Sequence, residues 1–298
     1  MNSHFYLLRT SAKNRIKEII HKPGKLVLYL LVILGLAGAL IVSLLGARHT
    51  QGSLSVSYLL PIVFAFLLLF YVISIRKGLS SGDAIFEMSD VNLLFLSPVN
   101  PRATLLYGVI RLVGMSFGAG FFLLFQGGTL ANFGVGFGGV LILFGVFILH
   151  MVALTLLSLL IYSVTNGRPA RKRLAGVLAA AMFIPLLTYF ALRFFAQGDL
   201  LLALNDIIAS PVLAATPFVG WASAGAMALI QGDLTAGLAW LGLLVLTSLG
   251  LLLYIMLSRS DYYEDVLVAT ETAFERKRAA AEGNVQAAGF ANARARVK

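Results

Sequence analysis

The sequence predicts an all-α fold: a polytopic integral membrane helical bundle of about six transmembrane helices, preceded by an interfacial amphipathic helix. Three observations predict it: the composition, the length of the apolar runs and the placement of the cations. Hydrophobic residues make up 59% of the 298 residues and charged residues only 12%. A soluble domain carries about 25% charged residues, so this chain lacks the polar surface of a water-exposed protein and needs lipid around it.

The apolar runs set the number and position of the spans. A hydrocarbon core about 30 Å thick takes about 20 helical residues to cross, and hydrocarbon leaves no water to pair backbone groups, so each run is expected to be a helix. The runs form one transmembrane domain over 26–257, and they are Leu26–Leu45, Val56–Ile75, Leu105–Phe125, Val135–Val164, Leu174–Phe195 and Ala236–Leu257.

The cations set the orientation of this domain. With the N-terminus inside, every Lys and Arg except Arg48 and Arg193 falls on the inner side of the spans. Cytoplasmic segments carry an excess of Lys and Arg, so both termini are predicted to be cytoplasmic. The net charge of +10 is then a matter of topology, and a nucleic-acid partner is unnecessary.

Residues 1–25 form a basic segment before the first span. Apolar residues recur there at three- and four-residue spacing, which predicts an amphipathic helix lying on the membrane surface against anionic lipid headgroups. Pro23 and Gly24 end it. A basic leader that serves only to set the topology is the alternative. The recurring apolar residues are Phe5, Leu8, Ala12, Ile16 and Ile19.

The inner loop over 76–104 is the most informative segment outside the membrane. Residues Asp83–Phe95 are predicted to form a short helix that presents Phe86, Leu93 and Leu94 among acidic residues. Pro98 and Pro101 prevent its continuation. An apolar cytoplasmic helix with a rigid end is typical of a docking element. A loop folded back onto its own bundle explains the same pattern, and periodicity does not separate the two interpretations.

Two further segments lie outside the regular spans. The outer segment 197–235 is apolar but broken by glycines and prolines, which predicts re-entrant or interfacial helices. A seventh span over 212–229 is the alternative; it would place the basic tail outside, against the charge rule. In the tail, 258–298, Ser258 and Asp261 begin a predicted cytoplasmic helix that runs to about Ala281, and small polar residues beyond Gly283 predict a disordered end.

The chain offers little chemistry of its own. It has no cysteine and four scattered histidines, of which only His150 lies deep in a span; a hydrogen-bonded role there is favoured over a proton relay. No Asp or Glu falls inside the six runs, which disfavours an ion-driven carrier. We therefore predict no catalytic residue, no metal site and no cofactor.

Glycines are dense between Gly114 and Gly139 without forming a nucleotide site. The segment 134–139 lacks the strand, helix and lysine context of a phosphate-binding loop, and no Gly-x-x-x-x-Gly-Lys-Ser/Thr occurs in the chain. Close helix packing through Gly114-x-x-x-Gly118 and its neighbours is the better explanation. ATP hydrolysis by this chain is not expected.

Two short segments carry a resemblance to a known family. Residues Met88–Arg102 read MSDVNLLFLSPVNPR, and residues Tyr262–Leu267, after the last span, read YYEDVL. The first is similar to the S-D-V-x-x-L-F-x-S-P-x-x-P-R loop that follows the second span in the membrane subunits of putative ABC exporters, a bacterial family related to the ABC-2-type permeases. The chain as a whole resembles these subunits.

The resemblance implies a function. It implies a permease subunit of an ATP-driven export system in the bacterial cell membrane, with a second permease bundle, identical or different, and a separate ABC-type ATPase. Residues Asp83–Phe95 would be the coupling helix in the ATPase groove. A non-transporting assembly or regulatory subunit is the alternative. The residues implied to contact the ATPase are Phe86, Ser89, Asp90, Leu94, Phe95, Ser97, Pro98 and Arg102.

Overall fold

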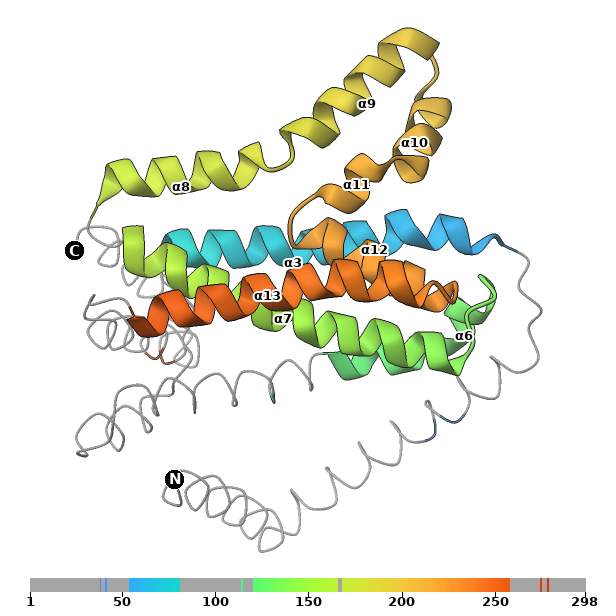
Figure 1. Ribbon diagram of the computed structural model, residues 1–298, viewed down its shortest axis with the longest axis horizontal. Helices are drawn as coiled ribbons and strands as arrows, with labels where there is room; N and C mark the ends of the chain where they lie inside the picture. Colours follow the sequence, from blue (N-terminus) through green and yellow to red (C-terminus); the bar gives the residue numbers. More distant parts are fainter. Residues whose placement is uncertain are drawn as a thin grey trace, which may run out of the picture.

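The computed structural model describes residues 54–80, 120–165 and 168–257, together with five isolated positions, Gly38, Ile41, Gly114, Phe274 and Arg278. Within these ranges every regular element is a helix (Figure 1). The all-α prediction is therefore confirmed. The predicted first span, most of the third, the N-terminal helix, the docking loop and the tail lie outside the described residues.

Among the described residues, three helices are long and apolar enough to cross a membrane. At 1.5 Å per residue they extend about 33, 44 and 36 Å. They lie side by side and run in the same direction (Figure 1), as expected for the second, fourth and sixth spans, and the largest shift from the predicted ends is the extension of one helix from Ile75 to Ser80. The three helices are α3 (Leu59–Ser80), α7 (Phe137–Thr165) and α13 (Leu234–Leu257).

The contact between α3 and α7 is close. A Cβ atom added at Gly78 would lie 2.8 Å from the backbone oxygen of Ser158, so only glycine lets the inner ends of the two helices approach this far. Further along, the Phe147 ring of α7 packs edge-on against Phe70 of α3 with centroids 5.2 Å apart. In the glycine-rich segment, an added Cβ at Gly120 would lie 2.9 Å from the Phe147 ring, whereas nothing lies within 4 Å of one at Gly114. Gly118 lies outside the described residues, so the packing predicted for Gly114 and Gly118 stays a prediction.

The predicted fifth span, Leu174–Phe195, is divided rather than continuous. It consists of α8 (Pro169–Ala181) and α9 (Ile184–Gln197), which are bent by 44° relative to each other. Pro185, the second residue of α9, has no N–H to donate to the Ala181 carbonyl at the end of α8, and its ring crowds that carbonyl. α8 lies along α3 and α7, whereas α9 diverges from the bundle (Figure 1).

The outer segment forms short helices in place of a seventh span. α12 is about 18 Å long at 1.5 Å per residue, too short for a core about 30 Å thick, yet it packs against α3, α7 and α13. It is therefore a short helix buried among the long ones, and the re-entrant or interfacial placement expected from the sequence stays a prediction. The helices of this segment are α10 (Leu200–Ala209), α11 (Pro211–Ala215) and α12 (Val219–Ile230).

The turn between α12 and α13 is held by an aspartate cap. Gly232 adopts a φ of 86°, a conformation that favours glycine. The Asp233 carboxylate accepts hydrogen bonds from the Ala236 N–H at 3.0 Å and from the Thr235 hydroxyl at 2.8 Å. These bonds hold the pKa of Asp233 below its usual value, first through the Ala236 amide. The carboxylate at the start of α13 is therefore favoured in its ionised form, and its negative charge interacts favourably with the helix dipole.

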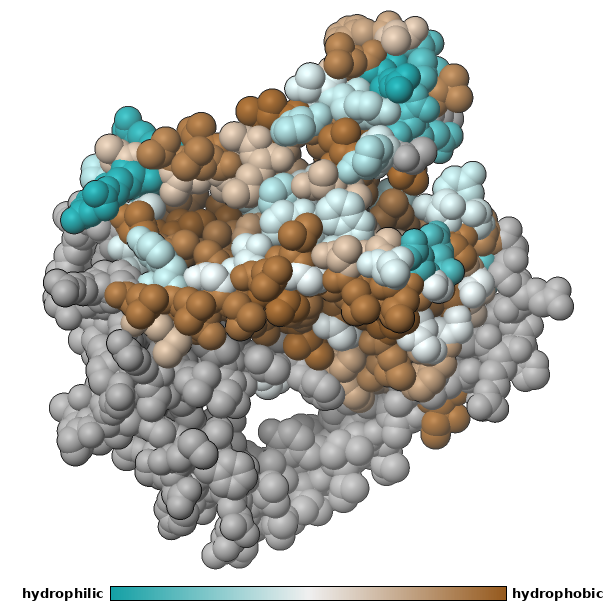
Figure 2. Space-filling model, in the orientation of Figure 1, coloured by the Kyte–Doolittle hydropathy of each residue, from teal (hydrophilic) through white to brown (hydrophobic). Residues whose placement is uncertain are grey.

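Charges gather at the two ends of the described bundle, and apolar surface covers the helices between them (Figure 2). The end where α3 stops and α8 begins carries only cations. The opposite end carries Asp199, Asp206 and Asp233, and its one described cation, Arg193, pairs with Asp206 at 3.5 Å. Which of these ends faces the cytoplasm stays a prediction from the placement of the cations. The cations at the first end are Arg76, Lys77, Arg168, Arg171, Lys172 and Arg173.

The orientation can be measured directly because the chain contains no cysteine. Ala170 is exposed at the cation-bearing end and Gln231 at the opposite end. We expect a membrane-impermeant maleimide to label Gln231→Cys in intact cells and to label Ala170→Cys only after the membrane is permeabilised, since cations mark the cytoplasmic side. The reverse pattern would contradict the orientation.

Candidate functional site

The residues predicted to bind an ATPase all lie outside the described residues. The structure shows where their segment begins: α3 ends at Ser80, at the cation-bearing end of the bundle. The positions of the predicted ATPase-contacting residues themselves stay a prediction. These are Phe86, Ser89, Asp90, Leu94, Phe95, Ser97, Pro98 and Arg102.

Among the described residues, the most unusual backbone lies where α12 begins. Phe218 has a φ of 61° and a ψ of −63°, and the Val219 N–H donates to the Pro217 carbonyl at 2.7 Å. This is the rare γ-turn in which the central residue has positive φ. Such a conformation costs an L-residue on the order of 1–3 kcal/mol, and it persists only where the surroundings hold it.

The turn pairs backbone groups that no water reaches. A helix that starts inside an apolar bundle leaves its first N–H groups without helical partners. Here Gly220 donates to the Thr216 carbonyl at 2.9 Å and Ala222 to the Phe218 carbonyl at 3.1 Å. Gly220 is required because an added Cβ would strike the carbonyl oxygens of Leu213 and Ala214. The start of α12 is therefore closely fitted to the end of α11.

His150 of α7 lies beside this turn and is fully buried. Its Nε2 is 3.2 Å from the Leu67 carbonyl oxygen of α3. A carbonyl only accepts, so Nε2 carries the proton, and Nδ1 is an acceptor without a partner among the described residues. The prediction that this histidine is hydrogen-bonded is confirmed. It joins α3 to α7 in the middle of the bundle.

Tyr71, one turn beyond Leu67 on α3, contacts both places where regular helix is interrupted: the bend between α8 and α9, and the γ-turn before α12. Its hydroxyl donates to the Ala179 carbonyl of α8 at 3.1 Å. Its ring centroid lies 5.3 Å from that of Phe183, at the bend between α8 and α9, and 6.4 Å from that of Phe218, in the γ-turn. Both breaks in regular helix therefore meet on one side chain of α3. Helix ends of this kind are where rearrangements between packed segments are absorbed.

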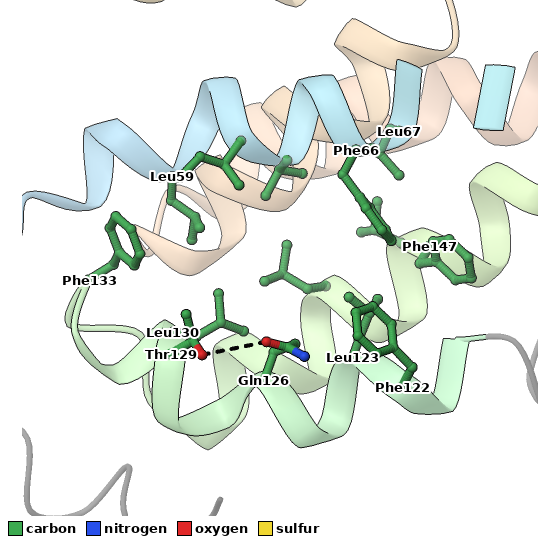
Figure 3. A pocket seen from close by; sticks show the side chains of 14 residues that line it. Leu59, Phe66, Leu67, Phe122, Leu123, Gln126, Thr129, Leu130, Phe133 and Phe147 are labelled. Carbon is green, nitrogen blue, oxygen red and sulfur yellow. Dashed lines mark hydrogen bonds between the residues drawn. The ribbon is translucent and has the colours of Figure 1, made fainter. Parts of the chain in front are cut away.

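A cavity of about 300 Å³ adjoins this junction, between α3, α7 and the segment formed by η3 (Phe121–Gln126) and α6 (Gly127–Ala131) (Figure 3). Among the described residues that line it, Gln126 and Thr129 are the only ones with polar side chains. The Thr129 hydroxyl donates to the Gln126 amide oxygen over a long 3.5 Å. The cavity is thus a hydrocarbon space with one weakly paired polar edge.

The cavity and the junction share residues. Leu67 lines the cavity with its side chain while its carbonyl accepts from His150, and Phe147, another lining residue, precedes His150 by nearly one turn of α7. A molecule seated in the cavity would therefore press on the two helices that His150 joins. Sequence patterns singled out His150 but neither the cavity nor the turn. Pro217 and Gly220, among the prolines and glycines that interrupt segment 197–235, were the visible signs of a break there.

The arrangement of the helices indicates the class of protein. Long parallel apolar helices, a bent span and a half-length helix starting inside the bundle are typical of polytopic membrane proteins that move molecules across a bilayer. The chain belongs to the "Putative ABC exporter" family, whose model matches residues 1–298. No curated protein and no solved structure matches it. Membership confirms the resemblance noted in the sequence, supports an ABC-type export role and implies association with an ABC ATPase.

The strain at Phe218 is testable by comparing two substitutions. Phe218→Ala and Phe218→Gly both lose the buried ring, which costs about 3–5 kcal/mol, but only glycine adopts a φ near 61° without strain. The free energy of unfolding, measured by detergent titration, should be higher for the glycine variant by about 1 kcal/mol.

A matched control is Phe190, within α9. There alanine should be the more stable replacement by about 1 kcal/mol, because it favours a helix over glycine. The same order at both positions, alanine above glycine, would show that Phe218 is not strained.

Proposed function

We propose that this chain is the membrane-spanning permease subunit of an ABC-type export system, driven by ATP hydrolysis on a separate subunit that docks on residues 83–95. The observation that carries the proposal is the family match over residues 1–298. The sequence supports it, because no Gly-x-x-x-x-Gly-Lys-Ser/Thr occurs in the chain. In this proposal ATP is therefore hydrolysed by another chain.

The geometry of α3 supports the assigned docking segment. This helix ends at Ser80, at the cation-bearing end, and the segment 83–95 follows directly. Cations mark the cytoplasmic side, where an ATPase has access to ATP. In this proposal both termini are cytoplasmic and the membrane is the bacterial cell membrane.

A docked ATPase would act on the bundle through α3. Tyr71 lies nine residues before Ser80, about 14 Å along the helix. A shift of the docked loop would move α3 as a rigid rod and so displace Tyr71 and Leu67. Tyr71 contacts the breaks at Phe183 and Phe218, and the Leu67 carbonyl is bonded to His150, so the bend and the start of α12 are where the pathway would open. A second permease bundle would supply the other wall of that pathway.

The docking segment is tested by placing acidic side chains in its apolar face. Leu94→Asp with Phe95→Asp should reduce the ATPase recovered with the affinity-purified permease at least about tenfold, since a buried unpaired charge in an interface costs more than the 1.4 kcal/mol that a factor of ten represents. Quantitative immunoblotting of the purified complex measures it.

The matched control lies at the opposite end of the bundle. Leu200→Asp with Leu202→Asp changes two leucines of α10 that are each 53% exposed, and ATPase recovery should be unchanged. Equal recovery from both double variants, with both bundles folded, would refute the docking assignment. If the unaltered chain recovers no ATPase at all, the proposal fails in favour of a non-transporting subunit.

A further inference from the structure

We propose that the cavity between α3, α7 and the η3–α6 segment is a binding site for one hydrocarbon chain of a membrane phospholipid. The inference is independent of the ATPase and of the docking loop. If it fails, the proposed export function is untouched.

The lining of the cavity selects hydrocarbon. Within the part of the chain that the structure describes, its walls consist of leucine, isoleucine, valine and phenylalanine side chains except at Gln126 and Thr129, and no charged residue lines it. Water needs two to four polar partners to occupy a buried site, and an apolar cavity of about 150 Å³ in another protein stays dry and takes up benzene. The present cavity is about twice that size and is open on one side, where its lining residues Ile62 and Phe122 are 53% and 49% exposed. In a membrane that opening faces hydrocarbon, so an apolar ligand is expected in the cavity rather than water.

The shape of the cavity selects a single chain. Along α3 the lining residues extend from Leu59 to Leu67, which is about 12 Å of helix. With a volume of about 300 Å³ over this length, the cavity has room for part of a hydrocarbon chain and not for a whole two-chain lipid. The long direction of the cavity follows α3 and α7 (Figure 3), as lipid chains follow the membrane normal.

The polar edge gives such a lipid an anchor. Gln126 and Thr129 lie together on the wall formed by η3 and α6 (Figure 3). Their mutual hydrogen bond of 3.5 Å is at the limit of a useful length, so either group can turn to the ester oxygens of a lipid. The cavity lies along the first turns of α3 and α7, away from the cations at the far end of α3. The lipid therefore belongs to the outer leaflet.

The test uses a phospholipid with a photoreactive diazirine in its acyl chain, added to the full-length protein in lipid nanodiscs. Irradiation followed by peptide mass spectrometry should place cross-links on cavity residues such as Phe122 and Val146. This labelling should saturate with the probe, and an unlabelled single-chain lysophospholipid should compete with it. Labelling of lipid-facing surfaces should not saturate.

Two pairs of substitutions fill the cavity or leave it unchanged. Val63→Phe on α3 and Val146→Phe on α7 add a phenyl group inside it. Their controls on the same helices are Val72→Phe and Val164→Phe, at outward positions that are 47% and 38% exposed. Filling the cavity should lower the apparent affinity of the protein for the photoreactive phospholipid, taken from the saturable labelling, at least about tenfold. In the control variants this affinity should stay within about twofold of that of the unaltered protein.

Three results would overturn the inference. Unchanged labelling in either filled variant, with the unfolding temperature of the unaltered protein retained, would show that the chain binds elsewhere. If both filled variants misfold, Phe122→Ala decides: it enlarges the cavity, and unchanged labelling at Val146 and unchanged probe affinity would reject the site. Cavity residues that cross-link to residues 26–45 under a protein cross-linker, with no lipid labelling, would show that this chain fills its own cavity.

Discussion

A helix that begins inside an apolar bundle exposes its first amide N–H groups where no water can pair with them. The start of α12 meets this constraint with a γ-turn at Phe218, a proline that brings no N–H, and carbonyls supplied by Thr216 and Pro217. Gly220 makes room for the carbonyl oxygens of Leu213 and Ala214, in α11, to approach the start of α12. The remaining architecture depends on this solution, because α12 packs against α3, α7 and α13 only if it can start in their midst.

The same junction explains why polar side chains occur deep in the described spans. His150 and Tyr71 each bond a backbone carbonyl of a neighbouring helix, at 3.2 and 3.1 Å. The first bond joins α3 to α7, and the second joins α3 to α8. α3 in turn reaches the cation-bearing end at Ser80, where the proposed docking segment starts. One helix thus connects the proposed site of energy input to both interruptions of regular structure.

The sequence predicted the features that depend on composition, and missed those that depend on geometry. Apolar length placed α3, α7 and α13 within a few residues, and a lone histidine in an apolar run identified His150. The bend between α8 and α9 was missed because the apolar run continues through Pro185. Nothing in the pattern distinguishes Phe218 from a core phenylalanine. The cavity is assembled from segments distant in sequence, so local periodicity carries no signal for it. The docking residues rest on the family resemblance.

The central claim is that this chain transports by means of ATP hydrolysed on another chain. The most direct measurement is the ATP hydrolysis rate of the purified permease in nanodiscs, alone and after addition of the ATPase subunit that associates with it. We predict no hydrolysis by the permease alone and a rate in the complex that differs clearly from that of the isolated ATPase. Hydrolysis by the permease alone, or an ATPase rate unaffected by the permease, would contradict the claim.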